Sequence, residues 1–332
     1  MMEPIEEQPT LEYELTEWLA LEPHLASQLT VDRESDTRSK LADDVADILL
    51  ARFRDPLTDY SPSAWSASSE VLIQSYGRIR AISAESLLEK YAVAADCETE
   101  GLPSTIEEIS RTAHCSDTHP LFDFIEHRAT KPQMAQLLYA ENLCDLNFVH
   151  LLSSVIPGVT GKPAAEMAEN LWDEWGHGAV DKFHCNIRLE MMGHAGIRID
   201  DSRLAAVDYL PEEVAHFNAY ALNGAVRRLN LRLIGMMYST EFLVPRQLRA
   251  VIAGWRRVGT PDREMQYLLD HFEGDVEHAS GWVDSVIRPV LARNESAARE
   301  LLIGALEHVD LLGSLYDKIY QDLTTPPIRG ES

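Results

Sequence analysis

Residues 162–196 read KPAAEMAENLWDEWGHGAVDKFHCNIRLEMMGHAG, and apolar residues recur along them with the 3.6-residue period of an amphipathic helix. Glycine marks the end of the pattern, as it does for many helices. Inside it, Glu174 and His177 stand three positions apart, which in a helix places both on one face. The stretch therefore predicts a long helix that presents an acid and an imidazole together.

Six other segments have the same period, and almost no part of the chain alternates polar and apolar residues with period two. They are residues 39–55, 83–97, 130–158, 211–245, 261–290 and 295–323. In the segment 130–158, Thr130 is a typical N-cap and Pro132 falls in the first turn. We therefore expect an all-α fold.

A polar stretch at residues 98–120 separates an N-terminal group of helices from the longer helices that follow it. We expect an N-terminal helical extension over residues 1–110 and a main helical domain over residues 111–325. The extension could pack on the main domain as additional helices, or it could serve as the arm of a homodimer.

Composition excludes several classes of function. The formal net charge is −25, which repels phosphate backbones and argues against nucleic acid as a partner. No apolar run approaches the roughly 18 residues of a membrane span, and the acidic N-terminus lacks the features of a signal peptide. The four cysteines form no CxxC pair, which argues against a zinc ribbon or a disulfide scaffold. We expect a cytoplasmic protein with no membrane partner.

Acids and histidines interrupt the apolar faces of four predicted helices. Each lies near the middle of its segment, where a core face would otherwise continue, and the last three fall within about 40° of one line on their helix. The seven residues are Glu141, Glu174, His177, Glu241, His271, Asp275 and His278.

This set of residues suits a pair of metal ions. Single glutamates from two helices, combined with a carboxylate and a histidine three positions apart on each of two others, are typical of carboxylate-bridged di-iron bundles. Carboxylates offset the charge of two cations, and imidazoles complete the coordination while leaving positions open for dioxygen. His184 is the alternative to His177, because it lies two turns further along on nearly the same side. Asp145 could support Glu141 from one turn away.

Over residues 119–322 the motifs YAENL, WDEWGHG, LEMMGH, YSTEFLVP and HFEGDVEH resemble those of the heme-oxygenase-like diiron oxidases and oxygenases, also called iron-containing redox enzymes. The resemblance implies a seven-helix, heme-oxygenase-like bundle, two Fe²⁺ ions, dioxygen as co-substrate and no heme. It makes the seven residues above the iron ligands, with His271 at a position where relatives have His or Asp.

The resemblance also implies a choice of reactions. We expect an N-oxygenase that oxidises the nitrogen of an amine or amino acid in small-molecule biosynthesis, with an electron donor as a further partner. Some N-oxygenating relatives have a glutamate where this chain has Met167. Oxidative desaturation or C–C cleavage of an amino or fatty acid is therefore the alternative. A metal-storing protein and a helical interaction module without catalysis are alternatives from other classes.

Overall fold

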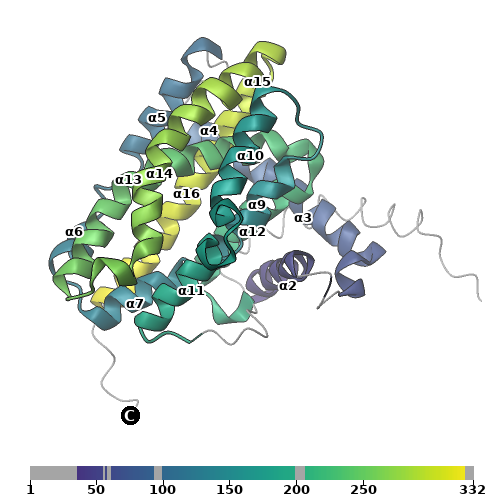
Figure 1. The fold of residues 1–332 in the computed structure, drawn as a ribbon. Helices are drawn as coiled ribbons and strands as arrows, with labels where there is room; N and C mark the ends of the chain where they lie inside the picture. The colour runs from purple at the N-terminus through teal and green to yellow at the C-terminus, as the bar shows by residue number, and fades with distance from the viewer. Residues whose placement is uncertain (1–35, 55–56, 58–60, 93–98, 199–205, 326–332) are drawn as a thin grey trace, which may run out of the picture.

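The computed structural model describes residues 36–54, 57, 61–92, 99–198 and 206–325 (Figure 1). The described residues form helices, and none of them lies in a β-strand. The main helices are α2 (Asp36–Phe53), α3 (Ala67–Glu85), α4 (Leu87–Lys90), α5 (Leu102–Thr112), α6 (Pro120–His127), α7 (Lys131–Ala140), α8 (Asn142–Asp145), α9 (Phe148–Val155), α10 (Lys162–Glu174), α11 (His184–His194), α12 (Pro211–Ala225), α13 (Asn230–Arg257), α14 (Gln266–Gly281), α15 (Arg288–Arg293) and α16 (Ala297–Thr324). The predicted all-α fold is confirmed.

Two long helices, α13 and α16, pack along each other through the middle of the bundle. They approach closely because each has a glycine at the crossing. A Cβ atom on Gly235 would lie 2.0 Å from the Leu301 carbonyl oxygen, and one on Gly304 would lie 2.0 Å from the Arg232 carbonyl oxygen. The two backbones are therefore in direct contact.

A layer of buried polar residues divides the apolar core in two. Along α13, one apolar cluster ends at Tyr238 and the other begins at Leu243. Along α16, the same two clusters end at Leu306 and begin at Val309. The buried residues between them include Glu241 and His308. Because unpaired buried polar groups cost free energy, such a layer indicates a functional site.

Several predicted helices are divided or shifted. The segment 162–196 forms α10 and α11 with two short 3-10 turns between them, so the single long helix predicted there is wrong. The segment 211–245 divides after Ala225, and α13 then continues past Pro245, the last residue of the predicted segment. The segment 83–97 begins inside α3. The start predicted at Thr130 is confirmed, since the Thr130 N–H donates to Gln133 Oε1 at 2.8 Å.

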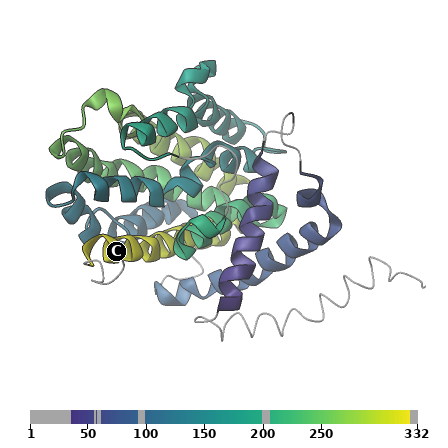
Figure 2. The ribbon, with the colours of Figure 1, turned by 90° about the horizontal axis from the view of Figure 1, so that it is seen from below.

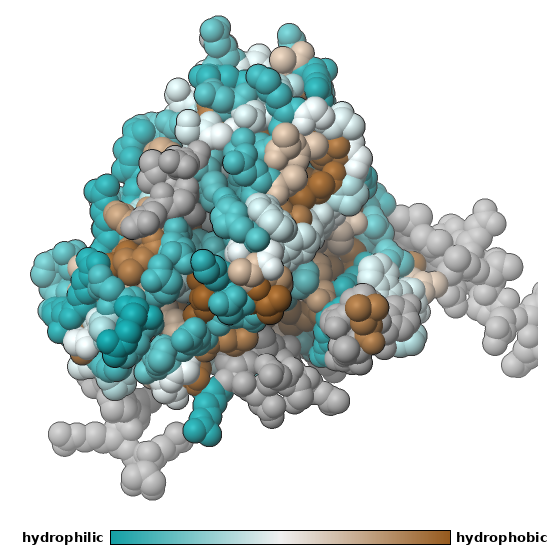
Figure 3. Space-filling view, in the orientation of Figure 1, coloured by the Kyte–Doolittle hydropathy of each residue, from teal (hydrophilic) through white to brown (hydrophobic). Residues whose placement is uncertain are grey.

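The N-terminal helices α2 and α3 lie at one side of the bundle (Figure 2). Both pack on α12, and their apolar residues belong to the same cluster as those of α12 and α16. The boundary predicted at residue 110 falls within α5, which packs on α13 and α16. On the face drawn in Figure 3, hydrophilic side chains predominate. No helix of the described ranges is long and apolar enough to cross a bilayer.

Candidate metal centre

Helix α14 carries His271 and His278 and packs against α11 and α13. Its histidines also reach the last turn of α10, where His271 lies close to Glu174 and His278 contacts Asp173. The helix continues directly into a π-helix, Trp282–Ile287, in which Trp282 Nε1 donates to Asn170 Oδ1 on α10 at 2.8 Å. Helix α14 is thus in contact with α10, α11 and α13, which carry other candidate ligands.

Glu174, His184 and His271 form a compact group from three helices. Glu174 Oε1 lies 3.2 Å from His184 Nδ1 and 3.7 Å from His271 Nε2. The three side chains are 11, 14 and 15% exposed, and one ligand atom from each lies within 4.8 Å of the others. Burial would raise the pKa of Glu174, but hydrogen bonds and positive charge from the imidazoles of His184 and His271, when these rings are protonated, outweigh it and lower the pKa to about 2. The carboxyl group is therefore ionised.

A hydrogen bond to the backbone fixes which ring nitrogen of His271 faces the Glu174 carboxylate. His271 Nδ1 lies 2.9 Å from the Tyr267 carbonyl oxygen, so Nδ1 carries the proton. In the neutral ring, Nε2 then presents its lone pair toward Glu174 Oε1. His184 Nδ1 is buried and makes no hydrogen bond to any residue that the structure describes. A cation between these atoms would satisfy all three.

Glu241 and His278 repeat the arrangement. His278 Nε2 donates to Asp173 Oδ2 at 2.8 Å, while Nδ1 lies 3.6 Å from Glu241 Oε2. The neutral ring thus presents a lone pair to a second buried carboxylate. Pro245 lies four residues after Glu241, and since proline has no N–H, the Glu241 carbonyl lacks its usual intrahelical donor.

Glu141 enters the site from the break between α7 and α8. Burial and the neighbouring Asp145 carboxylate raise its pKa to about 8, although Arg188 and Tyr316 act in the opposite direction. Arg188 is 1% exposed and pairs with Asp145, with 2.5 Å between Nη1 and Oδ2. The Glu141 carboxyl group therefore holds a proton at neutral pH when no cation is nearby.

Binding of a divalent metal ion near neutral pH should release this proton from Glu141. Between about pH 4.5 and 8 the free site keeps the proton, whereas a ligating carboxylate must lose it, so metal affinity should rise with pH and level off above about 8. Calorimetry in buffers with different ionisation enthalpies measures the release. Glu141→Gln should release about one proton fewer; equal release by both proteins would contradict the expectation.

His177 lies outside the group that surrounds Glu174. Helix α10 ends at Glu174, and His177 follows in a turn, with its side chain 70% exposed and its Nε2 3.1 Å from Asp173 Oδ1. Gly176, His177 and Gly178 all have positive φ, and a Cβ on Gly176 would lie 2.5 Å from the Lys182 backbone. The helical pairing predicted for Glu174 and His177 is therefore wrong. The ligand roles of both His177 and His184 stay predictions.

Asp275 lies in α14, one turn after His271, and its side chain lies outside the described residues. The other candidates line one cavity of about 480 Å³. Apolar side chains from the surrounding helices form much of its wall, among them Leu138, Phe148, Val251, Trp255 and Leu312. The arrangement can hold cations beside space for an organic molecule.

Residues 135–313, more than half of the chain, match the family described as iron-containing redox enzymes. The chain belongs to this family. The match contains every predicted ligand, and it confirms the resemblance seen in the sequence. It indicates iron and an oxidoreductase, which agrees with the heme-oxygenase-like bundle.

A crystal structure of a CADD-like protein of unknown function from Nostoc punctiforme has the same fold as this iron-containing redox enzyme. The TM-score is 0.53 at 14% identity, over 68% of this chain and 99% of the other. No curated protein is significantly similar to the chain.

The donor atoms fit iron in this iron-containing redox enzyme. Carboxylate oxygens and imidazole nitrogens are ligands that suit ferrous iron. Both histidines of α14 have one ring nitrogen fixed by an acceptor and the other turned toward a carboxylate. Metal-binding histidines are usually oriented in this way, with the second ring nitrogen donating to an acceptor.

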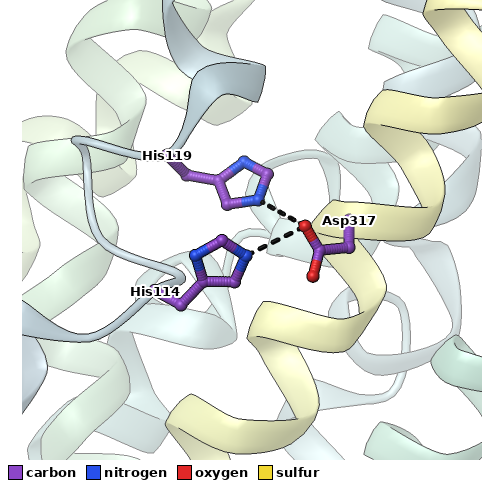
Figure 4. Close-up of side chains that lie close together, drawn as sticks. All are labelled: His114, His119 and Asp317. Carbon is purple, nitrogen blue, oxygen red and sulfur yellow. Dashed lines mark hydrogen bonds and ion pairs between the residues drawn. The ribbon is translucent and has the colours of Figure 1, made fainter.

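A second group with ligand-type residues, His114, His119 and Asp317, has a different character (Figure 4). The Leu121 N–H donates to His119 Nδ1 at 3.1 Å, so the proton of this ring lies on Nε2, which donates to Asp317 Oδ1 at 3.2 Å. His114 Nε2 lies 2.9 Å from the same oxygen. Burial acts to raise the pKa of Asp317, but the two imidazoles together outweigh it and hold the pKa below its usual range. Hydrogen bonds therefore suffice to explain this group.

Sequence reasoning missed two residues of the site in this iron-containing redox enzyme. Asp173 was not predicted, because only Glu174 next to it was assigned to the site. Arg188, one turn after His184 on α11, also donates from Nε to Asn142 Oδ1 at 2.9 Å and from Nη2 to the Leu138 carbonyl at 2.9 Å. It thereby fixes α11 against the α7–α8 break that carries Glu141. The position of Arg188 four residues after His184, on the same face of the helix, could have indicated that it belongs to the site.

Proposed function

We propose that this protein is a non-heme diiron oxidoreductase that uses dioxygen to oxidise the nitrogen of a small amine or amino acid. The observation that carries the proposal is the pair of α14 histidines, each of which turns one ring nitrogen toward a buried carboxylate in one cavity. Glu174, His184 and His271 would hold one iron, and Glu241 and His278 would contribute to a second. Iron held there supplies redox chemistry with dioxygen that amino-acid side chains lack.

The charges of the described cavity residues favour a cationic substrate. Carboxyl groups outnumber cations among the lining residues. Arg188 has its donors engaged by Asp145, Asn142 and a backbone carbonyl, and Lys182 stands exposed at the mouth. An anionic headgroup would therefore have few partners in the cavity besides the metal, whereas a protonated amine would be stabilised by the acids.

The apolar wall would hold the remainder of the substrate and keep water from the reacting atoms. Phe148 and Leu152 of α9 and Val251 and Trp255 of α13 all line the cavity. Together they form an apolar surface against which a hydrocarbon or aromatic group could pack. An electron donor and a homodimer remain parts of this proposal, as does a cytoplasmic site of action without nucleic-acid or membrane partners.

The experiment loads the protein with Fe²⁺ without oxygen, counts the iron, and then follows oxygen consumption with matched substrates. An aliphatic or aromatic amino acid should accelerate consumption and gain oxygen on nitrogen, while its N-acetylated form should do neither. A fatty acid that accelerates consumption would favour desaturation or C–C cleavage instead. Iron uptake without any substrate effect would indicate storage, and failure to bind iron would refute the proposal.

A further inference from the structure

Asp173, the penultimate residue of α10, makes contacts through both of its carboxylate oxygens. Oδ2 accepts a hydrogen bond from His278 Nε2 at 2.8 Å. Oδ1 lies 3.1 Å from Nε2 of His177 in the following turn. The carboxylate therefore joins a histidine at the mouth of the cavity to a histidine inside it, since both line the cavity with Asp173.

The contact with Asp173 decides which nitrogen of His278 carries the proton. A carboxylate accepts only from a protonated nitrogen, so in the neutral ring Nε2 carries the hydrogen and Nδ1 has the lone pair, 3.6 Å from Glu241 Oε2. Without Asp173, the proton could move to Nδ1 and bond directly to Glu241. That tautomer has no lone pair on the side of the site where Glu241 lies.

We propose that Asp173 is a positioning residue that fixes the tautomer and the ring orientation of His278, so that Nδ1 is available to a metal ion beside Glu241. The inference rests on the proposed function only in taking this cavity to hold a metal. Carboxylate partners of this kind orient metal-binding histidines and increase their basicity. Asp173 would do so from a different helix than the histidine it orients.

His177 gives the Asp173 carboxylate its second contact. The His177 backbone has φ of +54°, a conformation that is costly for a residue other than glycine. The turn between Glu174 and His184 thus directs this imidazole back toward the end of α10. This assigns His177 to the support of Asp173 rather than to direct contact with the metal.

The test measures binding of Co²⁺, a spectroscopic substitute for Fe²⁺, by competition with a chromophoric chelator. Asp173→Ala should weaken binding by about 10–100-fold, and Asp173→Asn by less, because an amide oxygen still accepts the His278 N–H. Proton NMR of the Co²⁺ protein should show a shifted, exchangeable His278 N–H that is lost in Asp173→Ala. A residue that only supports the fold would not move this signal selectively.

Asp181→Asn is the matched control, since Asp181 is an exposed acid in the same turn region. It should bind Co²⁺ as the parent protein does, and the variants should keep the helical circular dichroism of the parent. Unchanged affinity in Asp173→Ala, or an equal loss in Asp181→Asn, would overturn the inference while leaving the proposed function intact. Failure of the parent protein to bind any metal would defeat both.

Discussion

His184→Ala should abolish tight iron binding and oxygen consumption, whereas His177→Ala should keep most of both. His184 Nδ1 lies 3.2 Å from Glu174 Oε1 and has no hydrogen-bond partner among the described residues, so the substitution should remove a candidate ligand atom from the group that also contains His271. The loss should exceed the ~10–100-fold effect of removing an outer hydrogen-bond partner of a metal ligand. His177 is 70% exposed, and its Nε2 contacts Asp173 rather than Glu174.

Both variants are compared under the same anaerobic titration with Fe²⁺, followed by exposure to oxygen. His194→Ala is a suitable control, because His194 is a partly exposed histidine at the far end of α11 that pairs with Glu190. It should leave binding and oxygen consumption at the parental level. Equal losses in His177→Ala and His184→Ala would contradict the arrangement, as would full activity in His184→Ala.

Most of the helices could be predicted because each has an apolar face that the core requires. The segment 295–323 corresponds closely to α16, and 261–290 contains α14. The break after Glu174 could not be recognised from periodicity, since apolar residues continue at helical spacing through the turn. Gly176 and Gly178 were the signal for it, because positive φ at both positions ends the right-handed helix.

The site could be predicted in its residue types but only partly in its geometry. Glu174, His271, Glu241 and His278 line one cavity because α10, α13 and α14 meet, and spacing along each helix indicated the inward face. The choice between His177 and His184 depended on where α10 ends. The spacing of Glu174 and His177 alone could not show that end. Asp173 and Arg188 act through contacts between helices that are distant in sequence, so their partners could not be predicted from the residues next to them.

Gly304→Ala should lower the stability of the protein more than any other single methyl group added along α16. The new Cβ would lie 2.0 Å from the Arg232 carbonyl oxygen of α13, and backbone atoms cannot rotate away as a side chain does. The helices would have to separate, at a cost of about 3 kcal/mol in the free energy of unfolding. Because α13 carries Glu241, the separation should also weaken metal binding.

Gly313→Ala separates this effect from a general intolerance of α16 to change. The Cβ at position 313 would find its nearest neighbour, His114, at 3.6 Å, which is ordinary contact. Alanine favours helix over glycine by up to about 1 kcal/mol, so this variant should be as stable as the parent or more so. Urea unfolding followed by circular dichroism compares the midpoints. If Gly304→Ala unfolded at the same urea concentration as Gly313→Ala, the α13 and α16 backbones could not be in direct contact, and the position of Glu241 would need another cause.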